Sequence, residues 1–96
     1  MIVAEISRPR LSRHVVLKRD EARSRWVILA PERVLVPDDT AAEIVGMTDG
    51  EATVASIVDQ LAGKYQAPRE VIAADVVAML QELADQGYLV EGGEAA

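Results

Sequence analysis

The N-terminal half of the chain carries three short runs of apolar and β-branched residues. Residues 14–19 (HVVLKR) and 25–30 (RWVILA) are separated by the polar stretch DEARS, a pattern typical of a β-hairpin. A third run, residues 33–36 (RVLV), lies between Pro31 and Pro37. Because proline has no backbone N–H to donate to a ladder, a strand bracketed by two prolines favours the edge of a sheet. We therefore expect a three-stranded antiparallel sheet with residues 33–36 at one edge.

The apolar spacing changes to a helical period after the third run. Thr40 and Glu43 have the spacing of a capping box, in which a hydroxyl and a carboxylate satisfy free backbone amides, so a short helix is expected to begin there. Its inward side chains are Ile44, Val45 and Met47. After the turn residues Asp49 and Gly50, Thr53 is expected to cap a second helix. The core face of that helix consists of Val54, Ile57, Val58, Leu61 and Tyr65.

A third helix is predicted from Pro68 to about Gln86, because proline suits a first helical turn and Gly87 ends the pattern. Its core stripe consists of Ile72, Val76, Met79, Leu80 and Leu83. Both flanks of this stripe are largely small and apolar, which is unusual for a surface helix. One flank holds Ala73, Val77 and Ala84, and the other holds Val71, Asp75, Ala78 and Glu82. The pattern fits either an overfilled core helix or the wall of a shallow groove.

These elements predict one α+β domain over residues 11–90, a winged helix-turn-helix-like arrangement of an N-terminal antiparallel sheet followed by three helices. Residues 88–90 (YLV) fit either a further strand or a segment packed back on the core. We expect residues 1–10 to form a flexible N-terminal arm and residues 91–96, with two glycines, a flexible C-terminal tail. A chain of 96 residues allows one modest core.

The composition excludes several kinds of chemistry. The absence of cysteine removes disulfides, thiolate metal sites and cysteine nucleophiles. The single histidine, His14, opens a strand without an evident catalytic neighbour, and Asp38 and Asp39 precede a helix whose N-terminus they would complement. The glycines are too isolated for a phosphate loop. We predict no catalytic residue, metal site or cofactor. The N-terminus has no long apolar run, so we expect neither a signal peptide nor a membrane span. We therefore expect a cytoplasmic location.

The net charge of −6 is unevenly distributed. Residues 1–25 hold seven basic against three acidic side chains (+4), whereas residues 26–96 hold three basic against thirteen acidic ones (−10). Such asymmetry fits either a solvated surface or a means of orienting a partner. A winged-helix nucleic-acid binder is one alternative, but the candidate recognition helix, residues 68–86, has one basic and four acidic residues. Phosphate contacts need clustered Lys or Arg, so only the basic N-terminal strands support that alternative.

A sheet edge beside an apolar helix flank suggests peptide recognition. An extended peptide can add a strand to such an edge while its side chains enter neighbouring pockets. Residues 33–36 would supply the edge and the third helix the apolar wall. This hypothesis accounts for both the bracketed strand and the apolar flanks.

Several motifs also resemble the PqqD family, coenzyme PQQ synthesis protein D, over residues 8–90. They are Pro31-Glu32, the helix start TAAEI at residues 40–44, Asp49-Gly50, Thr53, and Asp75-Val76 followed by Leu80 and Leu83. The resemblance implies a winged-helix-like peptide chaperone of the kind called a RiPP recognition element. Such a protein binds the precursor peptide PqqA and presents it to PqqE, a radical S-adenosylmethionine enzyme that crosslinks Glu and Tyr side chains.

In this family peptides dock between the third strand and the third helix. The resemblance therefore implies peptide-binding roles for Arg33, Val34, Leu35, Val36, Val71, Asp75, Ala78 and Glu82, or for the opposite helix flank. Two residues depart from the pattern: Arg33 stands where the family usually has Gly, and Pro37 where Leu or Ile commonly ends the strand. A positive φ at residue 33 would strain Arg33, and Pro37 should shorten the edge. The main hypothesis is a non-catalytic adaptor; nucleic-acid binding and an accessory enzyme subunit are the alternatives.

Overall fold

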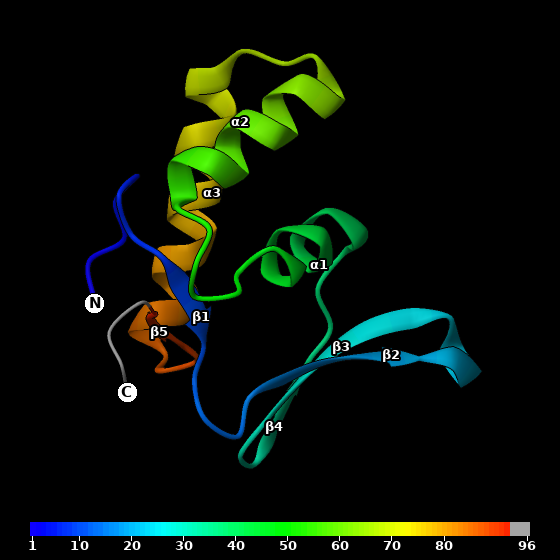
Figure 1. Ribbon diagram of the computed structural model, residues 1–96. Coiled ribbons are helices and arrows are strands. Elements are labelled where there is room, and N and C mark those ends of the chain that lie inside the picture. Colours follow the sequence, from blue (N-terminus) through cyan, green and yellow to red (C-terminus); the bar gives the residue numbers. More distant parts are fainter. Residues whose placement is uncertain (93–96) are drawn as a thin grey trace.

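The computed structural model describes residues 1–92 of the chain. One layer is a three-stranded antiparallel sheet in the order β2-β3-β4 (Figure 1). A 3₁₀ turn, Glu21–Arg23, joins the first two strands. The strands are β2 (Val16–Asp20), β3 (Arg25–Ala30) and β4 (Arg33–Leu35). The predicted three-stranded sheet is confirmed, although β4 ends one residue before the predicted boundary, since Pro37 cannot continue a ladder.

A second, two-stranded sheet pairs β1 (Pro9–Leu11) with β5 (Leu89–Glu91) in antiparallel register. The chain therefore has five strands in two sheets, whereas the sequence predicted one sheet. For residues 88–90 the sequence allows either a strand or a packed segment, and the structure has a strand that begins at Leu89 and ends at Glu91. The pairing brings together residues about eighty positions apart, which no local sequence pattern can indicate.

The first residues of the chain lie against the folded body. Val3 is 5% exposed and belongs to the helical core, and its N–H donates to Gln81 Oε1 at 2.8 Å. Arg69 Nη2 forms an ion pair with Glu5 Oε1 at 2.6 Å. This packing differs from the loose attachment expected of residues 1–10; their flexibility itself stays a prediction. Of the predicted tail, residues 93–96 lie outside the described part of the chain.

The chain also forms three helices: α1 (Asp39–Gly46), α2 (Val54–Tyr65) and α3 (Arg69–Asp85). The predicted capping box at Thr40 is wrong. Asp38 is the N-cap, and its carboxylate accepts the Ala41 N–H at 2.7 Å, so the cap lies two residues earlier than predicted and Glu43 is free for other partners. The predicted cap of α2 is confirmed, since Thr53 Oγ1 accepts the Ser56 N–H at 3.1 Å.

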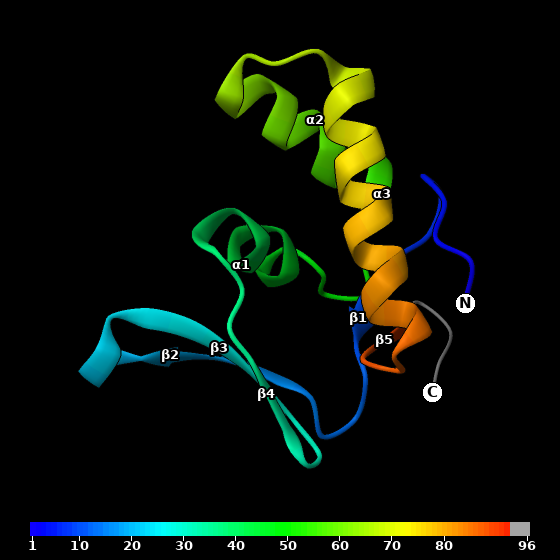
Figure 2. The same ribbon diagram turned by 180° about the vertical axis from the view of Figure 1, so that it is seen from behind.

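The core has two parts that meet around α1 and α3. Val54, Ile57, Val58 and Leu61 of α2 pack with Val76 and Leu80 of α3. Val15, Ile28 and Val45 form a smaller cluster between the sheet and α1. The predicted stripe of α3 is confirmed, because Ile72, Met79 and Leu83 pack against these buried residues. α1 thus lies between the sheet and the α2–α3 pair (Figures 1 and 2).

Gly92 is expected to be essential for closing the small sheet. A Cβ at this position would lie 2.3 Å from Gly50 Cα and 2.8 Å from the Arg8 carbonyl oxygen, and the Gly92 N–H donates to that oxygen at 2.6 Å. We therefore expect Gly92→Ala to lower the free energy of unfolding by about 1–3 kcal/mol. In urea denaturation the control Gly63→Ala, in an open helical position, should instead raise it by up to about 1 kcal/mol. Equal effects of the two variants would contradict the close approach at Gly92.

Candidate functional site

A groove of about 270 Å³ lies where β4 and the following turn meet α1 and α3. Its floor and walls are mostly apolar, and two polar side chains, Glu82 of α3 and Gln86 directly after it, stand among the lining residues. The other lining residues are Ile28, Leu35, Val36, Pro37, Ala41, Val45, Met79 and Leu83. The groove is therefore able to hold an apolar side chain from a segment that lies along β4.

β4 is the free edge of the three-stranded sheet beside this groove. Two residues connect β3 to β4, so Ala30 and Arg33 form the closing hydrogen-bonded pair, and Ile28 and Leu35 form the next one. The pair between them, Leu29 and Val34, is not hydrogen-bonded. The N–H and C=O of Val34 therefore point away from β3. Val34 is 58% exposed. It therefore offers one donor and one acceptor to an added strand.

Arg33 connects β4 to the end of α3. Its guanidinium donates to Gln86 Oε1 at 3.1 Å and to the Tyr88 hydroxyl at 3.3 Å, and it lies 5.9 Å from the centre of the Tyr88 ring. The positive φ of the turn falls on Glu32, at 61°. The strain that a positive φ at residue 33 would cause is therefore absent from Arg33, which begins β4.

The eight predicted peptide-binding residues divide between the groove and its surroundings. Leu35, Val36 and Glu82 line the groove, while Arg33 and Val34 belong to the adjacent strand. Asp75 instead lines a separate cavity of about 80 Å³ between α1, α2 and α3. The two remaining residues, Val71 and Ala78, are exposed on α3. The opposite flank of α3, with Ala73, Val77 and Ala84, is partly buried against the core.

The sequence did not predict the contribution of α1 to the groove. Ala41 and Val45 are four residues apart and therefore lie on one face of α1, towards α3. The sequence places Val45 in the core. The spacing of Ala41 and Val45 indicates that they share a helix face, and it is the only sign in the sequence that α1 contributes to the groove. That this face of α1 meets β4 and α3 depends on how the helix packs, which its own sequence does not specify.

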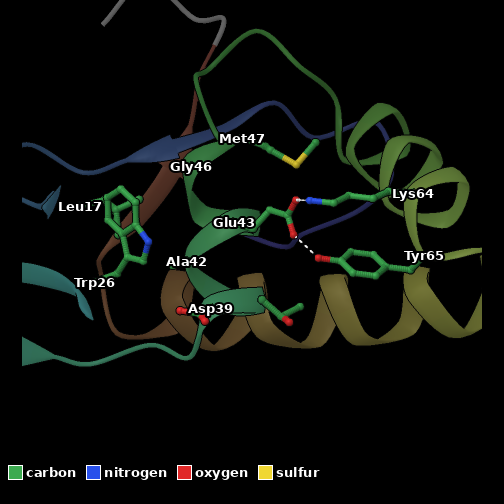
Figure 3. Close-up of a pocket in the computed structure, with 10 residues that line it drawn as sticks. Leu17, Trp26, Asp39, Ala42, Glu43, Gly46, Met47, Lys64 and Tyr65 are labelled. Atoms are coloured by element: carbon green, nitrogen blue, oxygen red, sulfur yellow. Dashed lines mark hydrogen bonds and ion pairs between the residues drawn. The ribbon is translucent and has the colours of Figure 1, made fainter. Parts of the chain in front are cut away.

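A larger cavity, of about 550 Å³, lies on another side of α1, against β2, β3 and the end of α2 (Figure 3). Leu17 and Trp26 line one side, and Lys64 and Tyr65 point towards Glu43 from the other. Lys64 and the Tyr65 hydroxyl both donate to the Glu43 carboxylate, and the hydrogen bond from Lys64, followed by that from Tyr65, lowers the pKa of Glu43. Tyr65 is 48% exposed, so its predicted place in the core face of α2 is wrong. This polar cluster joins α1 to α2.

Glu43→Gln is expected to reduce stability at pH 7 but not at low pH. The pKa of Glu43 in the folded protein lies below its usual value of 4.5, so its stabilising effect is fully present above that pH. The effect is lost as the pH falls through the lowered pKa, because the unfolded chain then binds the proton more readily. Urea denaturation should therefore show a difference between wild type and variant that shrinks from pH 7 to pH 3. A difference independent of pH would contradict the charged pairing.

The described residues, 1–92, contain neither a cluster of metal-ligating side chains nor a helix suited to span a membrane. No group of three or more His, Cys, Asp or Glu side chains is arranged to hold a metal ion. Within the same residues, no helix is both long and apolar enough to cross a membrane.

Comparison with known proteins identifies the family. The family described as "Coenzyme PQQ synthesis protein D (PqqD)" matches residues 25–89. The chain belongs to the PqqD family. It is 61% identical to a "PqqA binding protein" of Rhodopseudomonas palustris (strain BisB5), over 98% of this chain and 92% of that relative. A protein of the same name from Bradyrhizobium diazoefficiens is 59% identical over 96% of this chain and 89% of its own length.

A solved PqqD structure has a similar fold. The solution structure of the PqqD truncation of Methylobacterium extorquens PqqCD superimposes with a TM-score of 0.79 and 38% identity, covering 93% of this chain and 95% of that one. That truncation is described as a functional and stand-alone RiPP recognition element. The residues that match the PqqD family, 25–89, include every residue that lines the groove, whereas β2 lies outside them.

Proposed function

We propose that the chain is a non-catalytic peptide-binding adaptor of PQQ biosynthesis. It binds the precursor peptide PqqA by strand addition and presents it to the radical S-adenosylmethionine enzyme PqqE. The observation that carries this proposal is the free edge of β4, with the outward backbone groups of Val34, directly beside the apolar groove between β4 and α3. The names of the relatives, PqqA binding proteins, support the same ligand. Cytoplasmic action and a winged helix-turn-helix arrangement are parts of this proposal.

The proposed binding residues act in three ways. Val34 pairs through its backbone, while Leu35 and Val36 contact an inserted apolar side chain together with Met79 and Leu83 of α3. Glu82 favours a basic group on the peptide, and Arg33 favours an acidic one near the end of α3. Val71, Asp75 and Ala78 lie further along α3, where a longer peptide continues beyond the groove.

Calorimetric titration tests the proposal against the nucleic-acid alternative. Synthetic PqqA and a DNA duplex of about 20 base pairs are titrated separately into the chain at physiological salt. We expect saturable PqqA binding and no specific heat with the duplex, because α3 has a single basic residue, Arg69, which already pairs with Glu5 and Asp59. Tight duplex binding without a response to PqqA would overturn the adaptor proposal. Co-elution of PqqE with the chain on gel filtration tests the presentation step.

A further inference from the structure

The three-stranded sheet has a second face that α1 does not cover. The strand register aligns Val16 of β2, Leu29 of β3 and Val34 of β4 in one row. The adjacent row, Leu17, Ile28 and Leu35, faces the core, so the first row must point to the opposite side. Val16 and Val34 are 52% and 58% exposed. In Figures 1 and 2 no element of the described chain packs against this side of the sheet.

Val27 indicates that this face is an organised surface. It shares the face with Leu29, because strand side chains alternate, and it is only 6% exposed although it belongs to neither core cluster. Its register partner is Lys18, whose aliphatic stem lies on the same face. The face therefore has a small apolar centre of its own. We call Val16, Lys18, Asp20, Arg25, Val27, Leu29 and Val34 the outer sheet face.

The outer sheet face is positively charged on an acidic protein. Lys18 and Arg25 belong to it against one acid, Asp20, which gives +1, and the 3₁₀ turn at its end adds Glu21 and Arg23, whose charges cancel. Asp20 is shared between Arg23 and Arg25, each at 3.4 Å, so its charge is already compensated. The whole chain carries −6. A partner that combines apolar side chains with carboxylates is therefore complementary to this face, whereas the chain as a whole is acidic.

The size of the face decides what kind of partner fits. Three strands of three to six residues cover roughly 15 Å by 17 Å, far less than the roughly 800 Å² per partner that a stable dimer buries. A single helix, about 10 Å in diameter, matches this width. Helices pack on sheet faces, whereas extended segments add at sheet edges. The area thus favours one amphipathic helix over a second copy of this chain.

We propose that the outer sheet face docks an amphipathic helix of a partner protein, with apolar residues at its centre and Asp or Glu on both flanks. Val16, Leu29 and Val34 contact the apolar stripe of that helix, and Lys18, Arg23 and Arg25 pair with its carboxylates. The side chains of this face point away from the groove, so partner docking uses the side chains of the outer sheet face, whereas peptide binding uses the groove and the backbone of Val34. The inference therefore does not depend on the proposed peptide site.

Amide chemical-shift mapping on the ¹⁵N-labelled full chain tests this inference. The probe is a synthetic helical peptide of about 18 residues with a leucine stripe flanked by glutamates. We expect shifts at Val16, Lys18, Arg25, Leu29 and Val34, and binding at least about tenfold weaker when lysines replace the glutamates. Shifts confined to groove residues, equal affinity for both peptides, or no binding at millimolar peptide would each overturn the inference. Broadening of the same signals as the chain concentration rises, without peptide, would assign the face to a second copy of this chain. Displacement of the helical peptide by a DNA duplex would assign the face to nucleic acid. Either result would overturn the inference.

A matched pair of variants separates this face from the peptide site. Val16→Glu places a carboxylate in the apolar row and should weaken binding of the acidic helical peptide at least about tenfold. Ile6→Glu makes a similar chemical change on the N-terminal segment, at a position that is 85% exposed. It should alter the affinity for the acidic helical peptide by less than about twofold. Both variants should leave PqqA affinity unchanged. Loss of PqqA binding in Val16→Glu would overturn the separation of the two surfaces, whereas failure of wild type to bind PqqA would bear only on the proposed function.

Discussion

Val34→Pro is expected to weaken the binding of PqqA at least about tenfold, measured by calorimetry. Proline removes the outward N–H that an added strand would use, and its ring occupies the place of the incoming backbone. Val34 does not donate to β3, because it lies between the hydrogen-bonded pairs at Arg33 and Leu35. The β3–β4 hairpin should therefore survive the substitution. The far-ultraviolet circular dichroism spectrum should stay near that of wild type.

Val34→Thr is the matched control, since it keeps a β-branched side chain and restores the N–H. Its affinity for PqqA should lie within about twofold of wild type. Leu35→Pro is a weaker test, because the N–H of Leu35 points towards Ile28 and its loss would disturb the hairpin itself. If Val34→Pro and Val34→Thr bound PqqA equally well, strand addition at β4 would be wrong.

Leu80→Ala is expected to cause a large loss of stability, about 2–5 kcal/mol in the free energy of unfolding. The Leu80 side chain is 0% exposed and lies in the core between α2 and α3. Its truncation leaves a cavity that neighbouring helices fill only partly. Because α3 forms one wall of the groove, PqqA affinity should also fall at temperatures where the variant begins to unfold. Urea denaturation followed by circular dichroism measures the effect.

Val71→Ala is the control on the same helix. Val71 is 52% exposed, and alanine has the higher helix propensity, so stability should change by no more than about 0.5 kcal/mol. A loss in Leu80→Ala as small as that in Val71→Ala would contradict the assignment of Leu80 to the centre of the core.

The elements that the sequence predicted correctly are those that local patterns specify. The edge position of residues 33–36 followed from two prolines, and the buried stripe of α3 from helical spacing. The β1–β5 sheet and the burial of Val3 were not predicted, because their partners lie near the other end of the chain. The prediction of the N-cap of α1 was wrong because Asp38 and Thr40 are both good capping residues. In the structure Asp38 caps the helix, and Glu43 accepts from Lys64 and Tyr65 instead of closing a capping box.

The candidate site was predictable in part for the same reason. The strand side of the groove lies within one short segment, so Leu35 and Val36 were identified from sequence. On the helix side only Glu82 was selected, whereas Met79, Leu83 and Gln86 also face the groove. The rotation of α3 about its axis and the position of α1 decide which side chains line the groove. Both are consequences of tertiary packing.

Amide hydrogen exchange at Val34 is the most direct test of strand addition. In the free chain the Val34 N–H points to solvent and should exchange rapidly, whereas the Leu35 N–H, directed at β3, should exchange slowly. With saturating PqqA, exchange at Val34 should slow at least about tenfold, while that at Leu35 changes little. Unchanged exchange at Val34 in the presence of demonstrably bound PqqA would contradict peptide binding at the β4 edge.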